Sequence, residues 1–367
     1  MNKRVALDAA SIVRAGVVAL AVAVSVGWPA APASAAEPAA SATTRPAATE
    51  WAHSMRLILL GTGGGPGVQT ARSQPSSVLV VDGRPYLIDA GDGASQQLSR
   101  VGFQTYQIRA VFLTHLHIDH DGGLPAFMAF AWFNGSWGKA EQIVSPIQIY
   151  GPPATNYLVQ ASLDYLSVSA RIFRAGVTGL PPAAAAFKAH DIHVGKQPEL
   201  VFQDDLIRVT AVQNSHYHFY SGSPQTGQDE SYSYRFDTPA GSIVFTGDTG
   251  PEAITAIARM AQGSDVLVSE ILAPGPLGPA GARRPAAQTG ESAQMAQQIA
   301  AHMAQEHLTP DDVGTLAADA HAKVVLLTHY VGGRSGPGAA AFTAGVSRHF
   351  SGTVIPGIDL FEYDLFK

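Results

Sequence analysis

The sequence of 367 residues contains no cysteine. This absence excludes disulfide bonds, thiolate metal ligands and a lipid anchor attached to a cysteine. Any metal centre must therefore be built from histidine, aspartate or glutamate. A stable fold must depend on its hydrophobic core and on any bound metal ions.

Charged residues are also scarce, at 14% of the sequence, and lysine and arginine number only 23 against 29 acidic residues. The formal net charge of −6 is unfavourable for general nucleic-acid binding, which relies on clustered basic residues. Hydrophobic residues make up 46%, which is sufficient for the core of a large domain.

The N-terminal residues have the pattern of an export signal. Lys3, Arg4 and Arg14 precede an apolar run over residues 15–28, which is too short to span a bilayer comfortably. Ala33-Ser34-Ala35 then supplies the small residues of a cleavage site. We expect a signal peptide over 1–36, an Ala/Pro-rich linker over 37–53 and a folded domain over 54–367 that is periplasmic or secreted; an uncleaved anchor is the alternative.

The densest chemical motif is Thr114-His115-Leu116-His117-Ile118-Asp119-His120. It follows the apolar run Ala110-Val111-Phe112-Leu113, which predicts a buried strand, and precedes a Gly-Gly turn. The imidazoles and the carboxylate are thus expected at the carboxyl end of a strand, where α/β sheets place their sites. These side chains suit zinc, iron or manganese.

The H-x-H-x-D-H pattern of this motif resembles that of the metallo-β-lactamase-fold hydrolases. From Met55 to the C-terminus, the chain is most similar to the branch that contains ribonuclease Z, arylsulfatases and phosphodiesterases. The resemblance implies an α/β fold, a four-layer αβ/βα sandwich, and the alternation of strands and helices agrees with it. Pro66 disfavours a dinucleotide site in the glycine-rich turn 61–67, and the resemblance implies that this turn packs close to the metals.

The resemblance also implies two divalent ions, with zinc the expected metal. His115, His117 and His216 would bind one ion, with His218 as the alternative to His216. The other ion would be bound by Asp119, His120 and His329, and Asp248 would bridge the two. Asp89 would support the histidine loop from behind, as outer carboxylates do for ligating imidazoles.

The implied reaction is ester hydrolysis by a hydroxide that bridges the metals. A phosphodiesterase related to ribonuclease Z is the main expectation. An arylsulfatase, a lactonase and an inactive metal-binding protein are the alternatives. Asp119 and His307 are the expected catalytic residues. His307 stands in His-Leu-Thr-Pro, which resembles the His-Ser-Thr motif of ribonuclease Z, where a histidine assists the chemistry.

The expected partner is a small-molecule ester, and a homodimer is compatible with the sequence. Ribonuclease Z has a long arm for tRNA between the third histidine and the bridging aspartate. Only 32 residues separate His216 from Asp248. The short interval, the acidic net charge and the expected export predict that this chain does not bind tRNA.

Overall fold

The computed structural model describes residues 54–136, 146–219, 222–273, 302–332 and 340–365, which belong to one compact unit, Pro46–Lys367. The expected signal peptide over 1–36 and linker over 37–53 lie outside the described residues. So do most of a loop expected over 273–290 and the start of a helix expected from Ser292.

The first half of the domain, together with the C-terminal strand β14, forms a seven-stranded sheet. Its order is β14-β1-β2-β3-β4-β5-β6, antiparallel from β14 to β3 and parallel from β3 to β6. The strands are β1 (Met55–Gly61), β2 (Ser76–Val81), β3 (Arg84–Ile88), β4 (Ala110–Phe112), β5 (Ile147–Gly151), β6 (Phe187–Asp191) and β14 (Phe361–Leu365).

The second half forms another seven-stranded sheet, ordered β13-β12-β11-β10-β9-β8-β7. Strands β10 to β13 are parallel, and β7 to β10 are antiparallel. The strands are β7 (Glu199–Gln203), β8 (Arg208–Gln213), β9 (Tyr232–Thr238), β10 (Gly241–Phe245), β11 (Val266–Leu272), β12 (Val324–Val331) and β13 (Thr353–Pro356).

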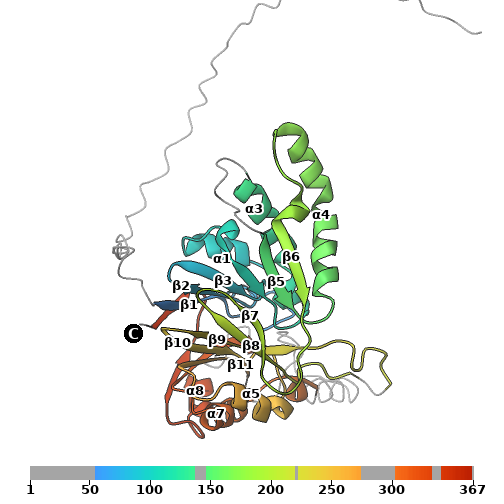
Figure 1. The fold of residues 1–367 in the computed structure, drawn as a ribbon. Helices are drawn as coiled ribbons and strands as arrows, with labels where there is room; N and C mark the ends of the chain where they lie inside the picture. Colours follow the sequence, from blue (N-terminus) through green and yellow to red (C-terminus); the bar gives the residue numbers. More distant parts are fainter. Residues whose placement is uncertain (1–53, 137–145, 220–221, 274–301, 333–339, 366–367) are drawn as a thin grey trace, which may run out of the picture. The chain divides into compact units, whose positions relative to one another are not determined.

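The two sheets pack face to face, with helices on their outer sides (Figure 1). Helices α1 (Ala94–Arg100), α3 (Leu124–Ser136) and α4 (Thr155–Gly176) cover the first sheet. Helices α5 (Ile254–Met260), α7 (Pro310–Asp319) and α8 (Ala340–Val346) cover the second. The expected four-layer sandwich is therefore confirmed.

Strand β1 shows why both faces of the sheets are apolar. Its Leu57 and Leu59 point into the core between the sheets, whereas Ile58 and Leu60 point toward the outer helices. Side chains alternate along a strand, so a strand covered on both faces is a continuous apolar run. Between the sheets, the Phe112 and Phe236 rings meet edge to face at 5.2 Å.

Two edge strands, β6 and β7, were not expected from the sequence. His190 was expected as a surface residue in a polar turn; it is partly exposed but does not lie in a turn. It lies on β6, where its ring stacks on Tyr150 at 4.4 Å and its Nε2 lies 2.8 Å from Oε1 of Gln148. An edge strand tolerates polar residues because it has a neighbour on only one side, so its sequence lacks the apolar run of a central strand. His193 is exposed, as expected.

No helix in the described part of the chain has the length and hydrophobicity needed to cross a lipid bilayer.

Candidate metal centre

The candidate ligands lie on loops at one end of the two sheets. His115, His117, Asp119 and His120 follow β4, and the short helix α2 (Ile118–Asp121) fixes the last two. His216 follows β8, Asp248 follows β10, and His329 lies near the end of β12. His329 has a φ of 42°, in the left-handed region, and such strained backbone often occurs at functional sites.

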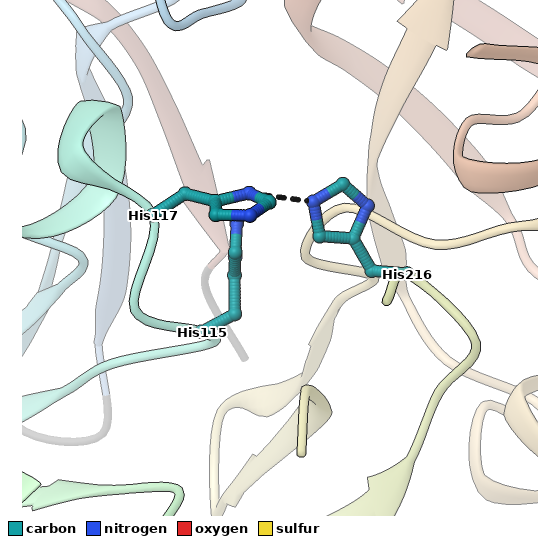
Figure 2. Close-up of side chains that lie close together, drawn as sticks. All are labelled: His115, His117 and His216. Atoms are coloured by element: carbon teal, nitrogen blue, oxygen red, sulfur yellow. Dashed lines mark hydrogen bonds between the residues drawn. The ribbon is translucent and has the colours of Figure 1, made fainter. Parts of the chain in front are cut away.

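The first cluster contains His115, His117 and His216, whose ligand atoms all lie within 4.8 Å of one another. Figure 2 shows the three rings converging, two from the loop after β4 and one from the loop after β8. Nε2 of His216 lies 3.0 Å from Nδ1 of His117. His115 and His216 are buried, whereas His117 faces outward. The cluster therefore opens to solvent on the His117 side.

The second cluster contains Asp119, His120, Asp248 and His329, and all four are buried. Nε2 of His329 lies 3.1 Å from Oδ2 of Asp248 and 3.3 Å from Oδ2 of Asp119. Nε2 of His120 lies 3.4 Å from Oδ1 of Asp248. The carboxylate of Asp248 also reaches the first cluster, because its Oδ2 is 3.9 Å from Nε2 of both His115 and His216. Asp248 therefore lies between the two clusters.

Several polar atoms at the centre have no hydrogen-bond partner. Nε2 of His115, Nε2 of His120 and Oδ1 of Asp248 are buried and unpaired in the described structure. Buried polar groups nearly always have partners, so three such atoms converging at one point are the arrangement expected of metal ligands. Nitrogen and oxygen donors in this arrangement fit divalent cations. The residues present therefore fit two metal ions.

The electrostatics of the first cluster favour neutral imidazoles. Burial, together with the neighbouring His120 and His216, lowers the pKa of His115 well below its usual value. Burial lowers the pKa of His216 to about 3 and also lowers that of His117. Histidine binds metals in its neutral form, so these three side chains are ready to act as ligands at neutral pH.

The second cluster attracts positive charge. Burial opposes ionisation of Asp119, but His120 and His329 outweigh it and lower the pKa of Asp119 to about 2. Burial likewise opposes protonation of His120, but the carboxylates of Asp248 and Asp89 raise its pKa well above the usual value. A divalent cation would take the place of the proton that these carboxylates otherwise hold on His120.

Asp89 supports the histidine loop from beneath. Its Oδ2 lies 2.8 Å from Nδ1 of His120, and its Oδ1 accepts a 2.7 Å hydrogen bond from the backbone nitrogen of Thr114. The hydroxyl of Thr114 also donates to Asp89. Asp89 therefore fixes the orientation of the imidazole and the backbone that leads into it, as expected of an outer carboxylate.

Gly65 allows the glycine-rich turn to pack directly on Asp119. A Cβ atom at position 65 would overlap the Asp119 carboxylate. Because real Cβ atoms essentially never approach another atom within 3.0 Å, this close packing requires glycine. The neighbouring Gly64 donates to the backbone oxygen of Tyr330, next to His329. The turn thus contacts ligand-bearing segments from both halves of the domain.

Glu270 is a site residue that the sequence reasoning did not find. It lies on β11, is only 1% exposed, and its Oε2 is 2.8 Å from Nδ1 of His307. Oε1 of Glu270 accepts hydrogen bonds from the backbone nitrogens of Thr249 and Leu308. The available signal was a carboxylate inside the apolar run Val-Leu-Val-Ser-Glu-Ile-Leu.

His307 is buried next to both clusters. Its ring centre lies 5.1 Å from that of His216 and 5.8 Å from that of His329, and its Nδ1 is 3.9 Å from Oδ2 of Asp248. Burial opposes protonation, but Glu270 raises the pKa of His307 to about 9. His307 is therefore a buried residue of the site. A position just before helix α7 would also have been compatible with an exposed histidine.

His218, the alternative to His216, belongs to neither cluster. Its Nε2 lies 4.0 Å from the exposed Glu252, and its backbone nitrogen donates to Glu306. His216 also points its Nδ1 at the backbone oxygen of Glu306, at 3.0 Å, which leaves Nε2 directed at the cluster. The geometry favours His216 as the ligand.

Comparison with known proteins identifies the family. The model of the β-lactamase superfamily domain matches residues 84–330, a range that contains every candidate ligand. Ribonuclease Z of Mycobacterium avium is 27% identical over 308 residues, covering 83% of this chain and 96% of that protein. Ribonuclease Z of Mycobacterium bovis is 25% identical over 315 residues, covering 85% and 98%. The chain belongs to the β-lactamase superfamily.

Solved structures of this superfamily share the fold. The short form of human tRNase Z matches with a TM-score of 0.54 and 19% identity, over 84% of this chain and 98% of that one. The metallo-β-lactamase-fold protein YhfI of Bacillus subtilis matches with a TM-score of 0.56 and 18% identity, over 85% and 99%. Within the superfamily this protein is ribonuclease Z-like, a metal-dependent hydrolase by family and by the chemistry of its side chains.

These relatives correct one expectation. A small-molecule ester partner and an absence of tRNA binding were expected, in part because Asp248 follows His216 by only 32 positions. The chain nevertheless aligns with 96–98% of the length of two ribonuclease Z enzymes. One short interval therefore does not separate this chain from its RNA-processing relatives, and the expectation was wrong.

Proposed function

We propose that this protein is a phosphodiesterase of the ribonuclease Z type that hydrolyses RNA with two zinc ions. The observation that carries the proposal is the position of Asp248 between two clusters of ligand atoms, with His307 beside both. The names of the most similar relatives favour RNA as the substrate. By contrast, the relatives named above offer no support for a sulfatase or a lactonase.

When bound, two divalent cations would supply a deprotonated water as nucleophile and would stabilise negative charge on the phosphoryl oxygens. His115, His117 and His216 would hold one cation, Asp119, His120 and His329 the other, and Asp248 both. The remaining tasks belong to the protein: the attacking water must be aligned, and the leaving oxygen must receive a proton.

Asp119 and His307 are placed for these two tasks. Asp119 stays ionised because its pKa is about 2, so its carboxylate can accept a hydrogen bond from the attacking water. Glu270 holds Nδ1 of His307, which leaves Nε2 to give a proton to the leaving oxygen. A positioned acid contributes about 10²–10⁴-fold to such a reaction.

The test is a panel of substrates with the purified protein. A precursor tRNA with a 3′ trailer, an unstructured RNA of equal length and an aryl sulfate are incubated with zinc, with chelator, and with zinc restored. Asp248→Asn serves as the matched inactive variant. We expect zinc-dependent cleavage of RNA, loss with chelator, recovery on re-addition and no sulfate release.

Absence of RNA cleavage by the zinc-loaded wild-type protein would refute the proposal. In that case, retention of two zinc ions would favour a metal-binding protein without activity. Cleavage that persists in chelator and in Asp248→Asn would instead indicate a contaminating nuclease.

A further inference from the structure

Three exposed apolar side chains lie on three of the segments that build or contact the metal centre. Val68 is three residues from Gly65, which packs on Asp119. Ile118 lies between two candidate ligands, and Phe219 lies three residues after His216. Their exposed fractions are 77%, 68% and 36%. We call Val68, Ile118 and Phe219 the apolar rim.

We propose that the apolar rim binds a nucleobase next to the cleaved phosphodiester bond, with Phe219 as the stacking surface. This inference rests on the proposed function. Single exposed apolar residues are common and need no explanation. Here, however, three residues from separate segments are exposed beside one site, whereas Leu113 is buried and Leu116 and Tyr217 are half-buried.

A series of rings connects Phe219 to the metal centre. The Tyr217 ring meets the His117 ring edge to face at 5.1 Å, and the Phe219 ring lies 5.7 Å from Tyr217 at an interplanar angle of 36°. The hydroxyl of Tyr217 accepts a 2.9 Å hydrogen bond from the backbone nitrogen of Leu116. The Tyr217 ring is therefore held by the loop that carries the ligands, and Phe219 packs on a fixed support.

The charges nearby favour stacking over phosphate recognition. The ionisable groups next to the Tyr217–Phe219 segment include the exposed Glu252 and the carboxylate of Glu306, which contacts the backbone of His218. Such groups repel a phosphate backbone. A planar base needs no basic partner, because every base offers an aromatic face and stacking depends little on sequence.

The experiment is a double-mutant cycle between the protein and the RNA. An RNA that the wild-type protein cleaves is prepared with a single abasic site at each of three positions on either side of the cleaved bond. Wild type, Phe219→Ala and Phe219→Trp are compared on each RNA. Phe130→Ala, which removes a 50% exposed phenylalanine from α3, is the matched control.

We expect Phe219→Ala to raise KM about tenfold with little change in kcat, and Phe219→Trp to restore KM. With the abasic site at one of these positions, the KM of the wild-type protein should rise by the same factor. The KM of Phe219→Ala should rise no further on that RNA. If the abasic site raised KM equally for the wild-type protein and for Phe219→Ala at all six positions, the inference would be overturned. A change in kcat alone would overturn it as well. If the wild-type protein cleaves no RNA, the proposed function fails instead.

A fold defect is recognised separately. If Phe219→Ala loses zinc or thermal stability relative to Phe130→Ala, then Phe219→Leu and Phe219→Trp are used as the pair. Both keep a large apolar side chain, but only tryptophan can stack. A KM for Phe219→Leu equal to that for Phe219→Trp would then overturn the inference.

Discussion

Substitution of Gly65 by alanine should disable the metal centre without unfolding the protein. The new methyl group would overlap the carboxylate of Asp119, and a contact of at least 3.0 Å can be restored only if that carboxylate moves by more than about 1 Å. Asp119 is held between His120 and His329, so its displacement would alter the whole second cluster. The glycine-rich turn cannot move away freely, because the backbone nitrogen of Gly64 donates a hydrogen bond to the backbone oxygen of Tyr330.

The expected magnitude follows from this displacement. A shift of about 1 Å at reacting groups costs on the order of 100-fold in rate, and disturbed ligand support costs about 10–100-fold in metal affinity. Zinc affinity is measured by competition with a chromogenic chelator, and the rate is measured on a nitrophenyl phosphodiester. Gly67→Ala is the control, because a Cβ atom at Gly67 would meet nothing within 4 Å. Wild-type affinity and rate in Gly65→Ala would refute the packing argument.

Four further outcomes are expected. His307→Ala should keep its metals, and its rate should fall about 10²–10⁴-fold on diesters with alkyl leaving groups. Its rate on nitrophenyl esters should fall little, because nitrophenolate leaves without a proton. Equal losses of rate on both substrates would remove His307 from the mechanism. Asp248→Ala should reduce bound zinc from two ions per chain, measured by elemental analysis, and an unchanged ratio would contradict the shared position of Asp248. Asp89→Asn should weaken zinc binding about 10–100-fold in chelator competition, and unchanged affinity would show that Asp89 is only a turn residue. N-terminal sequencing of the exported protein should begin close to Ala36, whereas an intact Met1 would indicate an anchor.

The sequence was sufficient for the architecture because both sheets have covered faces. Apolar runs such as residues 57–60 and 266–268 mark central strands, and the H-x-H-x-D-H motif falls directly after another such strand. The helix start at Thr309 is also readable, because Pro310 follows it and Asp312 lies in the first turn; in the structure Thr309 and Asp312 form a capping box. Strands β6 and β7 were missed because edge strands need no such run.

The parts of the site that escaped prediction depend on contacts between distant segments. Glu270 and His307 are 37 residues apart, and nothing local in either segment indicates that they pair. His216 was preferred to His218 only through the family resemblance, because both follow the same strand on one loop. It is decided by the backbone oxygen of Glu306, 90 residues from His216.

Each cluster draws its side chains from both sheets, and this gives the cations a mechanical role. Asp119 and His329 are separated by 210 residues, yet they contact one another across the end of the sandwich. A cation held by both would act as a cross-link that closes a very long loop, the kind of restraint that a disulfide supplies in other proteins. The chain has no cysteine for a disulfide, and a cross-link through a cation is reversible. Chelation would therefore separate the two sheets first at the end that carries the candidate ligands.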